Sequence, residues 1–183
     1  MTDFKLKVRE GIHLSAIRET DKPAVLQHLQ TSDIYRTTMH IPHPYVEADA
    51  DSWIAKRIEH TKRVGKEATL AIRDHQGFFI GAVGADNFEP GLIHTAEIGY
   101  WLARPFWGQG IMTDVVRAYV RYAFDELHVL RLTAHVLEFN AASARVLEKN
   151  GFKLEGRFRK HFLKDGELLD ARFYGLLKED VLR

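Results

Sequence analysis

The spacing of hydrophobic positions changes along the chain, and the clearest change comes between residues 95 and 126. Residues 95–102 are rich in β-branched and aromatic side chains, which predicts a strand. From residue 111 the apolar positions follow a helical period, with charged positions on another face. The apolar face holds Ile111, Val115, Ala118, Tyr119 and Tyr122, and the charged face holds Asp114, Arg117, Arg121 and Asp125. The pattern predicts a strand, a tight turn and an amphipathic helix.

The other segments alternate in the same way between strand and helix patterns. Strands or hairpins are expected at 6–17, 68–73, 78–85, 131–136, 153–163 and 168–177, and helices at 20–30, 47–64 and 140–150. Residues 37–45 contain two prolines and are expected to form an irregular loop, and residues 164–167 a hairpin turn. In this order the elements predict an α+β fold, with a mixed, mostly antiparallel sheet flanked by helices on both faces.

Length and composition fit one globular domain. The chain has 183 residues, of which 45% are hydrophobic and 28% charged, and we expect a single domain spanning 1–183. The formal net charge of +1 gives no reason to expect nucleic acid or a membrane surface as a partner. Cysteine is absent, which excludes disulfides, thiolate catalysis and cysteine metal sites. With no apolar N-terminal segment and no run of membrane-spanning length, we expect a cytoplasmic protein. His40 and His43 have no third ligand in reach, so we expect no metal.

Gly108 and Gly110 flank Gln109 where the expected strand passes into the expected helix. Glycine lacks Cβ, so an anion can approach the backbone closely, and the first amides of a helix have no internal acceptor. The loop is therefore either a phosphate or pyrophosphate site or an ordinary strand-to-helix turn. A nucleotide-binding P-loop is disfavoured, because Ile111 and Met112 stand where that motif has lysine and serine or threonine.

A second motif follows the expected strand at 131–136. Asn140 and Ser143 lie three residues apart on a helix that ends with Lys149-Asn150-Gly151-Phe152. The order of glycine loop, helix, strand and Asn-x-x-Ser helix resembles the GNAT superfamily of acyl-CoA-dependent N-acyltransferases. The closer resemblance is to its ribosomal-protein N-terminal acetyltransferase branch, the RimJ/RimL-like group. It covers about residues 14–177 and is strongest over 97–152.

The resemblance implies that acetyl-CoA is the co-substrate and that the glycine loop holds its pyrophosphate. Pro105 stands at the first position of the GNAT loop motif and has no N–H, so one familiar amide contact is missing or moved. Leu102 would present strand backbone to pantetheine, and Asn140 would contact the same arm unless it is only an N-cap. The implied cofactor-binding residues are Trp101, Leu102, Phe106, Trp107, Gly108, Gln109, Gly110, Ile111, Met112, Asn140 and Ser143. The aromatic residues among them can instead pack in the core.

Acyl transfer from a thioester to an amine needs a neutral amine, correct positioning, a donor to the carbonyl oxygen and a proton for the leaving thiolate. The resemblance implies that Ser143 is the general acid near the sulfur, whereas the alternative makes it only the residue whose amide Asn140 caps. Many GNAT enzymes place a tyrosine acid four residues further on, where this chain has Leu147. By the same resemblance Glu97 is the general base, usually acting through water, and otherwise it is a solvated edge carboxylate. The rival bases are His94, Asp86 and His135.

The sequence therefore predicts an N-acetyltransferase that moves the acetyl group of acetyl-CoA to a primary amine within a ternary complex. The absence of cysteine removes the commonest thiol nucleophile of the alternative two-step route. By resemblance the acceptor is a protein N-terminus. The alternatives are a small-molecule amine (polyamine, amino acid or antibiotic) and a non-catalytic CoA-binding regulatory module. We expect a monomer or homodimer, with the acceptor pocket shaped by residues 39–45 and the first two helices.

Overall fold

One sheet with the strand order β1-β2-β3-β4-β5-β6-β8-β7 forms the centre of the protein. The computed structural model describes residues 4–86, 88–89, 91 and 94–181. Among the described strands every neighbouring pair is antiparallel except β5 and β6, which run parallel. The strands are β1 (Lys5–Arg9), β2 (Ile12–Ala16), β3 (Thr69–Arg73), β4 (Phe79–Asp86), β5 (Thr95–Leu102), β6 (Arg131–Leu137), β7 (Lys153–Lys164) and β8 (Glu167–Leu177). The predicted mixed, mostly antiparallel sheet is confirmed.

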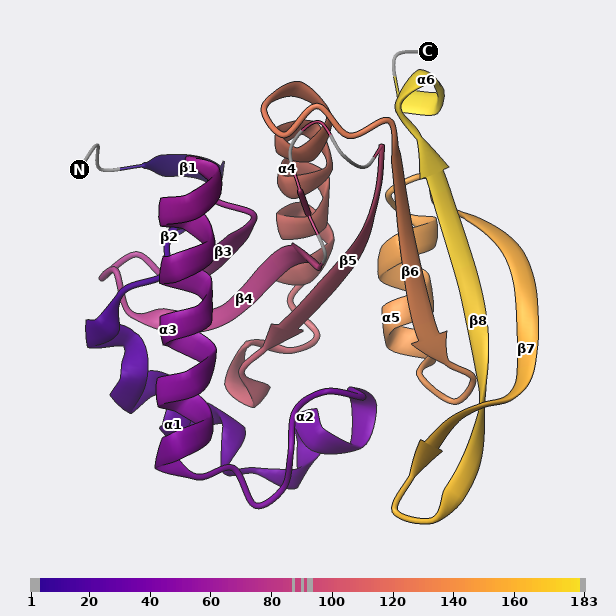
Figure 1. Ribbon diagram of the computed structural model, residues 1–183, viewed down its shortest axis with the longest axis horizontal. Coiled ribbons are helices and arrows are strands. Elements are labelled where there is room, and N and C mark those ends of the chain that lie inside the picture. Colours follow the sequence, from indigo (N-terminus) through magenta and orange to yellow (C-terminus); the bar gives the residue numbers. More distant parts are fainter. Residues whose placement is uncertain (1–3, 87, 90, 92–93, 182–183) are drawn as a thin grey trace.

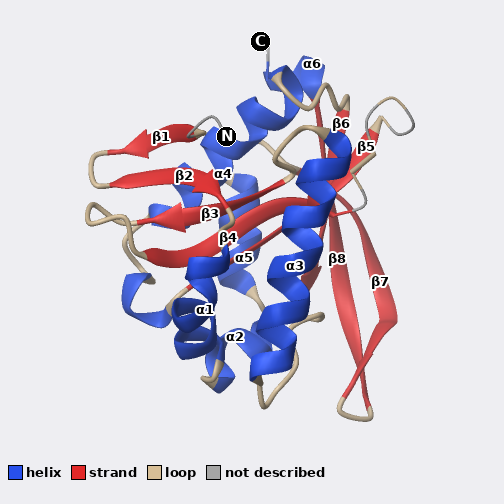
Figure 2. Ribbon diagram, turned by 60° about the vertical axis from the view of Figure 1, so that its left-hand side comes forward, coloured by secondary structure: helices blue, strands red, loops and turns tan. Residues whose placement is uncertain are grey.

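Helices cover both faces of the sheet, as predicted (Figures 1 and 2). On one face lie α1 (Lys22–Leu29), α2 (Ser32–Thr37) and α3 (Glu47–Val64), and on the other lie α4 (Ile111–Asp125) and α5 (Ala141–Glu148). Each face has its own core: Val25, Ile34 and Ile54 pack on the first face, and Val115, Tyr119 and Leu147 on the second. The short helix α6 (Lys178–Val181) follows β8.

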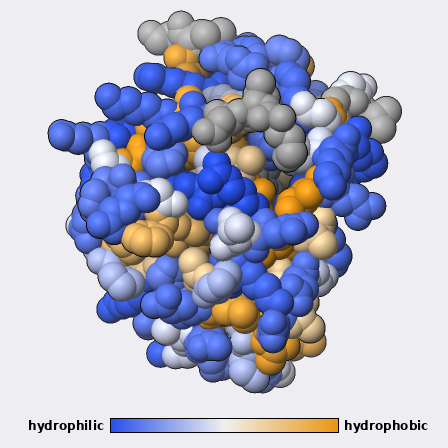
Figure 3. Space-filling view, turned by 90° about the vertical axis from the view of Figure 1, so that its left-hand side faces the viewer, coloured by the Kyte–Doolittle hydropathy of each residue, from blue (hydrophilic) through white to orange (hydrophobic). Residues whose placement is uncertain are grey.

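The amphipathic patterns explain how these helices pack. In α4 the predicted apolar positions Ile111, Val115, Tyr119 and Tyr122 are buried, and Ala118 is half-buried. The helix α3 buries Ala50 and Ile54 and ends at Gly65, whose φ of +73° suits glycine. Figure 3 shows the side that carries β1, α1 and α3 in Figure 1; this surface is largely hydrophilic, with small and separate hydrophobic areas.

The strands β5 and β6 pair only where they begin. Residues 95–97 pair with residues 131–133, and beyond this point the two strands diverge (Figure 1). The amide of Ala103 donates to the carbonyl oxygen of Ile80 in β4 at 2.8 Å. Main-chain groups alternate in direction along a strand, so those of Tyr100 and Leu102 point away from β4 and toward the divergence.

Side chains alternate along β5 as well. Ile98, Tyr100 and Leu102 pack with the core under α4 and α5, whereas Trp101 packs with the core under α1–α3. Glu97 lies in register with Trp101, so its side chain projects from the α1–α3 face. At the opening between the diverging strands, Tyr100 and Leu102 therefore lie on the α4–α5 face of the sheet, and Glu97 and Trp101 lie on the α1–α3 face.

Two features of the first face were not expected from the sequence. The six-residue helix α2 precedes the proline loop, in a segment to which no element had been assigned. The Asp21 carboxylate is buried and accepts from both terminal nitrogens of Arg73, at 2.8 and 2.9 Å. Breaking such a buried pair by removing one partner costs about 3–5 kcal/mol, so the pair fixes the start of α1 to β3.

No helix in the part of the chain that the structure describes combines the length and apolar character needed to cross a bilayer.

Candidate functional site

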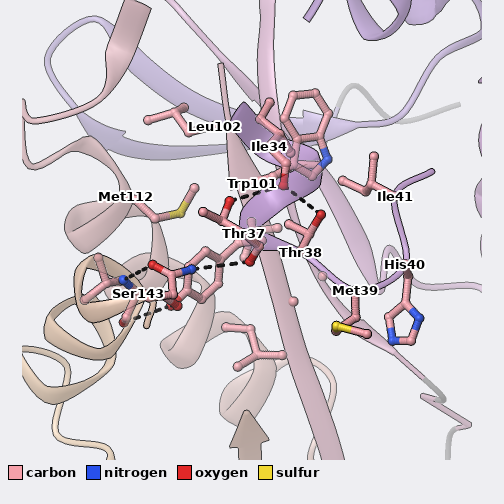
Figure 4. Close-up of a pocket in the computed structure, with 18 of the residues that line it drawn as sticks. Ile34, Thr37, Thr38, Met39, His40, Ile41, Trp101, Leu102, Met112 and Ser143 are labelled. Carbon is pink, nitrogen blue, oxygen red and sulfur yellow. Dashed lines mark hydrogen bonds between the residues drawn. The ribbon is translucent and has the colours of Figure 1, made fainter. Parts of the chain in front are cut away.

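A cavity of about 1200 Å³ opens where β5 and β6 diverge. Its lining comes from both faces of the sheet: Trp53 and Lys56 of α3 on one side, and Ser143 and Lys149 of α5 on the other. Figure 4 shows Met112 and Ser143 on one side of the pocket and Met39, His40 and Ile41 on the opposite side. Because α3 and α5 cover opposite faces, the cavity passes through the sheet at the divergence.

The glycine loop forms one end of this cavity. Gly108 and Gly110 have φ of +75° and +74°, a region that favours glycine, and Gly110 is the N-cap of α4. A Cβ at either position would meet no protein atom within 4 Å, so the space above the loop is open. The first-turn amides of α4, beginning at Ile111, have no intrahelical acceptor. Gly110 has no side chain that could accept from them instead. This geometry suits a phosphate group.

Side chains on either side hold the loop in place. The Gln109 side-chain amide donates to the Pro105 carbonyl at 3.0 Å, and Arg9 of β1 donates to the Gln109 carbonyl at 3.1 Å. Gln109 is thus turned onto the loop and is not among the described residues that line the cavity. The Trp107 indole donates to the Leu102 carbonyl at 2.6 Å and, like Phe106, packs against the core.

The start of α5 uses the predicted cap. Asn140 Oδ1 accepts from the Ser143 amide at 3.1 Å, and its Nδ2 donates to the Thr37 carbonyl of α2 at 3.3 Å. The N-cap role of Asn140 is confirmed, and the same side chain ties α5 to the helix on the other face. Both ends of its amide have protein partners, and its contact with pantetheine stays a prediction.

Ser143 is paired with a tyrosine that the sequence reading did not single out. Its Oγ lies 2.8 Å from the Tyr100 hydroxyl, which is also 3.3 Å from the Ser143 carbonyl. Burial raises the pKa of Tyr100 far above its ordinary value, so its phenol stays protonated and can donate to Ser143. Alternation along β5 was the available signal, since it places Tyr100 on the α5 face. Leu147 is fully buried in the core there.

Glu97 is paired on the opposite face of the sheet. Its Oε1 lies 2.7 Å from His135 Nδ1, and both side chains line the cavity. From the sequence, Glu97 and His135 are rival candidates for the general base. In the structure they are hydrogen-bonded to each other. His94 is exposed at the start of β5 and is not among the described lining residues. The side chain of the last rival, Asp86, lies outside the described residues.

The charges in the lining are mostly positive. Arg145 and Lys149 of α5 lie on the glycine-loop side, and Lys56 and Arg57 of α3 on the other. Among the described residues, no group of three or more His, Cys, Asp or Glu side chains could hold a metal ion. All predicted cofactor-binding residues except Gln109 line the cavity: Trp101, Leu102, Phe106, Trp107, Gly108, Gly110, Ile111, Met112, Asn140 and Ser143. The cavity can therefore accept an anionic ligand at one end, with hydroxyl and carboxylate groups on opposite sides of its centre.

Comparison with known proteins identifies the family. The model of the acetyltransferase (GNAT) domain matches residues 12–153. The probable N-acetyltransferase YjcK of Bacillus subtilis is 39% identical over 133 residues, covering 68% of this chain and 71% of YjcK. The putative ribosomal N-acetyltransferase YdaF of the same organism is 35% identical over 136 residues, covering 74% of this chain and 70% of YdaF.

A solved structure shows the same fold. It is RimL, a ribosomal L7/L12 alpha-N-protein acetyltransferase, in complex with coenzyme A. The TM-score is 0.84 at 24% identity, covering 95% of this chain and 98% of that chain. The predicted family and fold are confirmed: the chain belongs to the GNAT family and is an acetyl-CoA-dependent N-acetyltransferase.

Proposed function

We propose that this enzyme transfers the acetyl group of acetyl-CoA directly to the α-amino group of a polypeptide N-terminus. The observation that carries the proposal is the cavity that passes through the sheet. Its volume of about 1200 Å³ exceeds the roughly 300–1,000 Å³ typical of a pocket for one drug-sized ligand. Because its lining comes from both faces of the sheet, acetyl-CoA and the acceptor can enter it from opposite faces and meet at its centre. The names of YdaF and RimL, which refer to ribosomal proteins, support a polypeptide acceptor.

The α4–α5 face suits the anionic substrate. In this proposal the pyrophosphate binds the amides at Gly110 and Ile111, and Arg145 and Lys149 supply positive charge beside them. Pairing with β6 ends at Glu97, and no described residue bonds the main-chain groups of Tyr100 that point into the divergence, so they can bond the pantetheine arm. The Leu102 carbonyl already accepts from Trp107, so Leu102 has only its amide to offer.

The two polar pairs then divide the proton transfers. The amine must lose a proton as it bonds to the thioester carbon, and the sulfur must gain one as the carbon–sulfur bond breaks. Glu97, with His135 beside it, accepts the amine's proton on the acceptor face. Ser143 donates to the sulfur on the other face, and the protonated Tyr100 holds the Ser143 hydroxyl in place. Because the amine and the sulfur approach from opposite faces, one acid and one base can act without neutralising each other.

The experiment uses a peptide with a free N-terminus and one internal lysine, and the same peptide with a formylated N-terminus as its matched control. After incubation with enzyme and acetyl-CoA, fragment mass spectra locate the added acetyl group. We expect acetylation of the α-amine of the free peptide and none of the formylated peptide. Acetylation of the lysine, or of free amino acids and spermidine but neither peptide, would contradict the proposal.

A further inference from the structure

Five rings gather on the α1–α3 face of β6, β8 and β7, beyond the area that the helices cover. We call this cluster the aromatic platform; it consists of His135, Phe158, His161, Phe162 and Phe173. The His135 ring lies 4.9 Å from Phe173, 5.1 Å from His161 and 5.8 Å from Phe162, measured between centroids. Phe158 stacks on Phe173 at 5.6 Å. These rings form one continuous surface.

The platform is open to solvent. Phe158 is 39% exposed although it is a large apolar side chain, and His161 is exposed as well. Phe162 and Phe173 are half-buried. An exposed cluster of apolar rings on a protein surface marks a binding site more often than a single scattered apolar residue does.

A bulge in β7 builds the platform. Phe158 pairs with Ala171 and Phe162 with Leu169, so residues 159–161 lie opposite Asp170 alone. Asp170 accepts from the Lys160 amide at 2.7 Å, and Lys160 has a φ of +52°. The bulge lets His161 stack on His135, with 15° between the ring planes. Bulges commonly re-aim side chains next to active sites.

The platform is continuous with the reaction centre. His135 belongs to it and also bonds Glu97, and Phe162 lines the cavity. At the tip of the same hairpin, Lys164 donates to the carbonyls of Tyr35 and Thr38 at the end of α2. These two bonds attach the β7–β8 hairpin to the end of α2. The platform therefore borders the acceptor side of the cavity, opposite the loop that follows α2.

The charges of the lining argue against a polycationic acceptor. The acidic residues among the described lining residues are Asp49 and Glu97. Asp49 accepts from the Val46 amide at 2.9 Å, and Glu97 is paired with His135. With these two carboxylates set against Lys56, Arg57, Arg145 and Lys149, the lining repels a polyamine, whereas an apolar group gains by covering the rings.

We infer that the aromatic platform binds an aromatic or large aliphatic side chain on one of the first two residues of the acceptor. The inference rests on the proposed function in taking a peptide N-terminus as the acceptor. Covering such a side chain is worth enough to favour it roughly tenfold or more in kcat/KM over glycine.

The test compares Phe-Gly-Gly and Gly-Phe-Gly amides with Gly-Gly-Gly amide. It also compares 2-phenylethylamine with ethylamine, so that the preference can be read if peptides are not acetylated at all. Failure of every peptide would contradict the proposed function, and the amine pair would then still test whether the platform binds an apolar group next to the acceptor amine. The platform is supported if a ring-bearing acceptor is favoured about tenfold in either comparison.

Two variants decide whether the platform causes the preference. Phe158→Ala should reduce the kcat/KM preference for the ring-bearing acceptor by about threefold or more. The loss is partial because one of several rings is removed. Leu163→Ala is the matched control, because Leu163 is 67% exposed on the same strand and follows Phe162 onto the other face. Three results would overturn the inference: no preference in the wild type, an unchanged preference in Phe158→Ala, or an equal loss in both variants.

Discussion

The hydrogen bond between Ser143 and Tyr100 allows a prediction about the leaving group. We expect Ser143→Ala to lower kcat while the dissociation constant of CoA changes little, because the proposed role begins only when the carbon–sulfur bond breaks. Tyr100→Phe should lower kcat less, since it removes the partner that holds the Ser143 hydroxyl and not the donor itself. The phenylalanine keeps the ring that packs in the core.

The magnitudes follow from the chemistry and the geometry. A thiol has a reference pKa of about 8.5, so its thiolate leaves readily and proton donation helps modestly. We expect Ser143→Ala to cost at most about a hundredfold, the lower end for general acid–base assistance. The contact of 2.8 Å between Ser143 and Tyr100 is a single hydrogen bond. Its loss is worth about 1 kcal/mol, or roughly fivefold in kcat for Tyr100→Phe.

The assay follows release of the CoA thiol under saturating substrates, with CoA affinity measured separately by calorimetry. The double variant supplies the decisive comparison. If Tyr100 acts only through Ser143, adding Tyr100→Phe to Ser143→Ala should cause no further loss. Independent and multiplying losses would refute the positioning role of Tyr100. An unchanged kcat with weakened CoA binding in Ser143→Ala would make Ser143 a cofactor contact and not the acid.

Three further predictions concern the loop, the base and the buried tyrosines. Gly110→Asp should abolish CoA binding, measured by calorimetry. Gly110→Asn should weaken CoA binding less, because asparagine tolerates the same positive φ and adds no charge. Equal effects of the two variants would contradict a phosphate site. Glu97→Gln and His135→Gln should both lower kcat/KM mainly at low pH, and the deficit should shrink as the pH approaches the pKa of the acceptor's α-amine, about 8. A deficit that is equal at every pH would make the pair structural. Burial raises the pKa of Tyr45 and of Tyr122 to about 12, so the unfolded chain loses these protons first. The free energy of unfolding should then be unaffected by these tyrosines below about pH 10. It should fall by roughly 2–3 kcal/mol per tyrosine by pH 12. Urea unfolding should show this slope, and it should be smaller in Tyr45→Phe; an unchanged slope would contradict the assignment.

Features set by neighbouring residues were predictable from the sequence. The strand at 95–102, the glycine turn and the helix after it lie next to one another, and each carries its own signal. The cap at Asn140 is also local, because its partner is the amide of Ser143. The turn between β7 and β8 follows from Asp165-Gly166, where both residues have positive φ.

Features that depend on distant pairing were not predictable. Tyr100 and Ser143 are 43 residues apart, and Glu97 and His135 are 38 apart, so each pair meets only when β5, β6 and α5 are assembled. The sequence could name Glu97 and His135 as rivals but not join them. The bulge before Phe162 was hidden for a similar reason, because the register of β7 on β8 is set by Asp170 across the hairpin. Helix α2 has only six residues, too few for its apolar positions to show a helical period, although Thr31 and Asp33 stand where a helix start favours them.

The central claim is that both substrates occupy the cavity at once, one from each face of the sheet. Initial velocities of the wild-type enzyme over a grid of acetyl-CoA and acceptor peptide concentrations test it most directly. The through-sheet cavity predicts double-reciprocal lines that intersect, since transfer requires a ternary complex. Parallel lines, with acetylated enzyme trapped when the peptide is omitted, would contradict it.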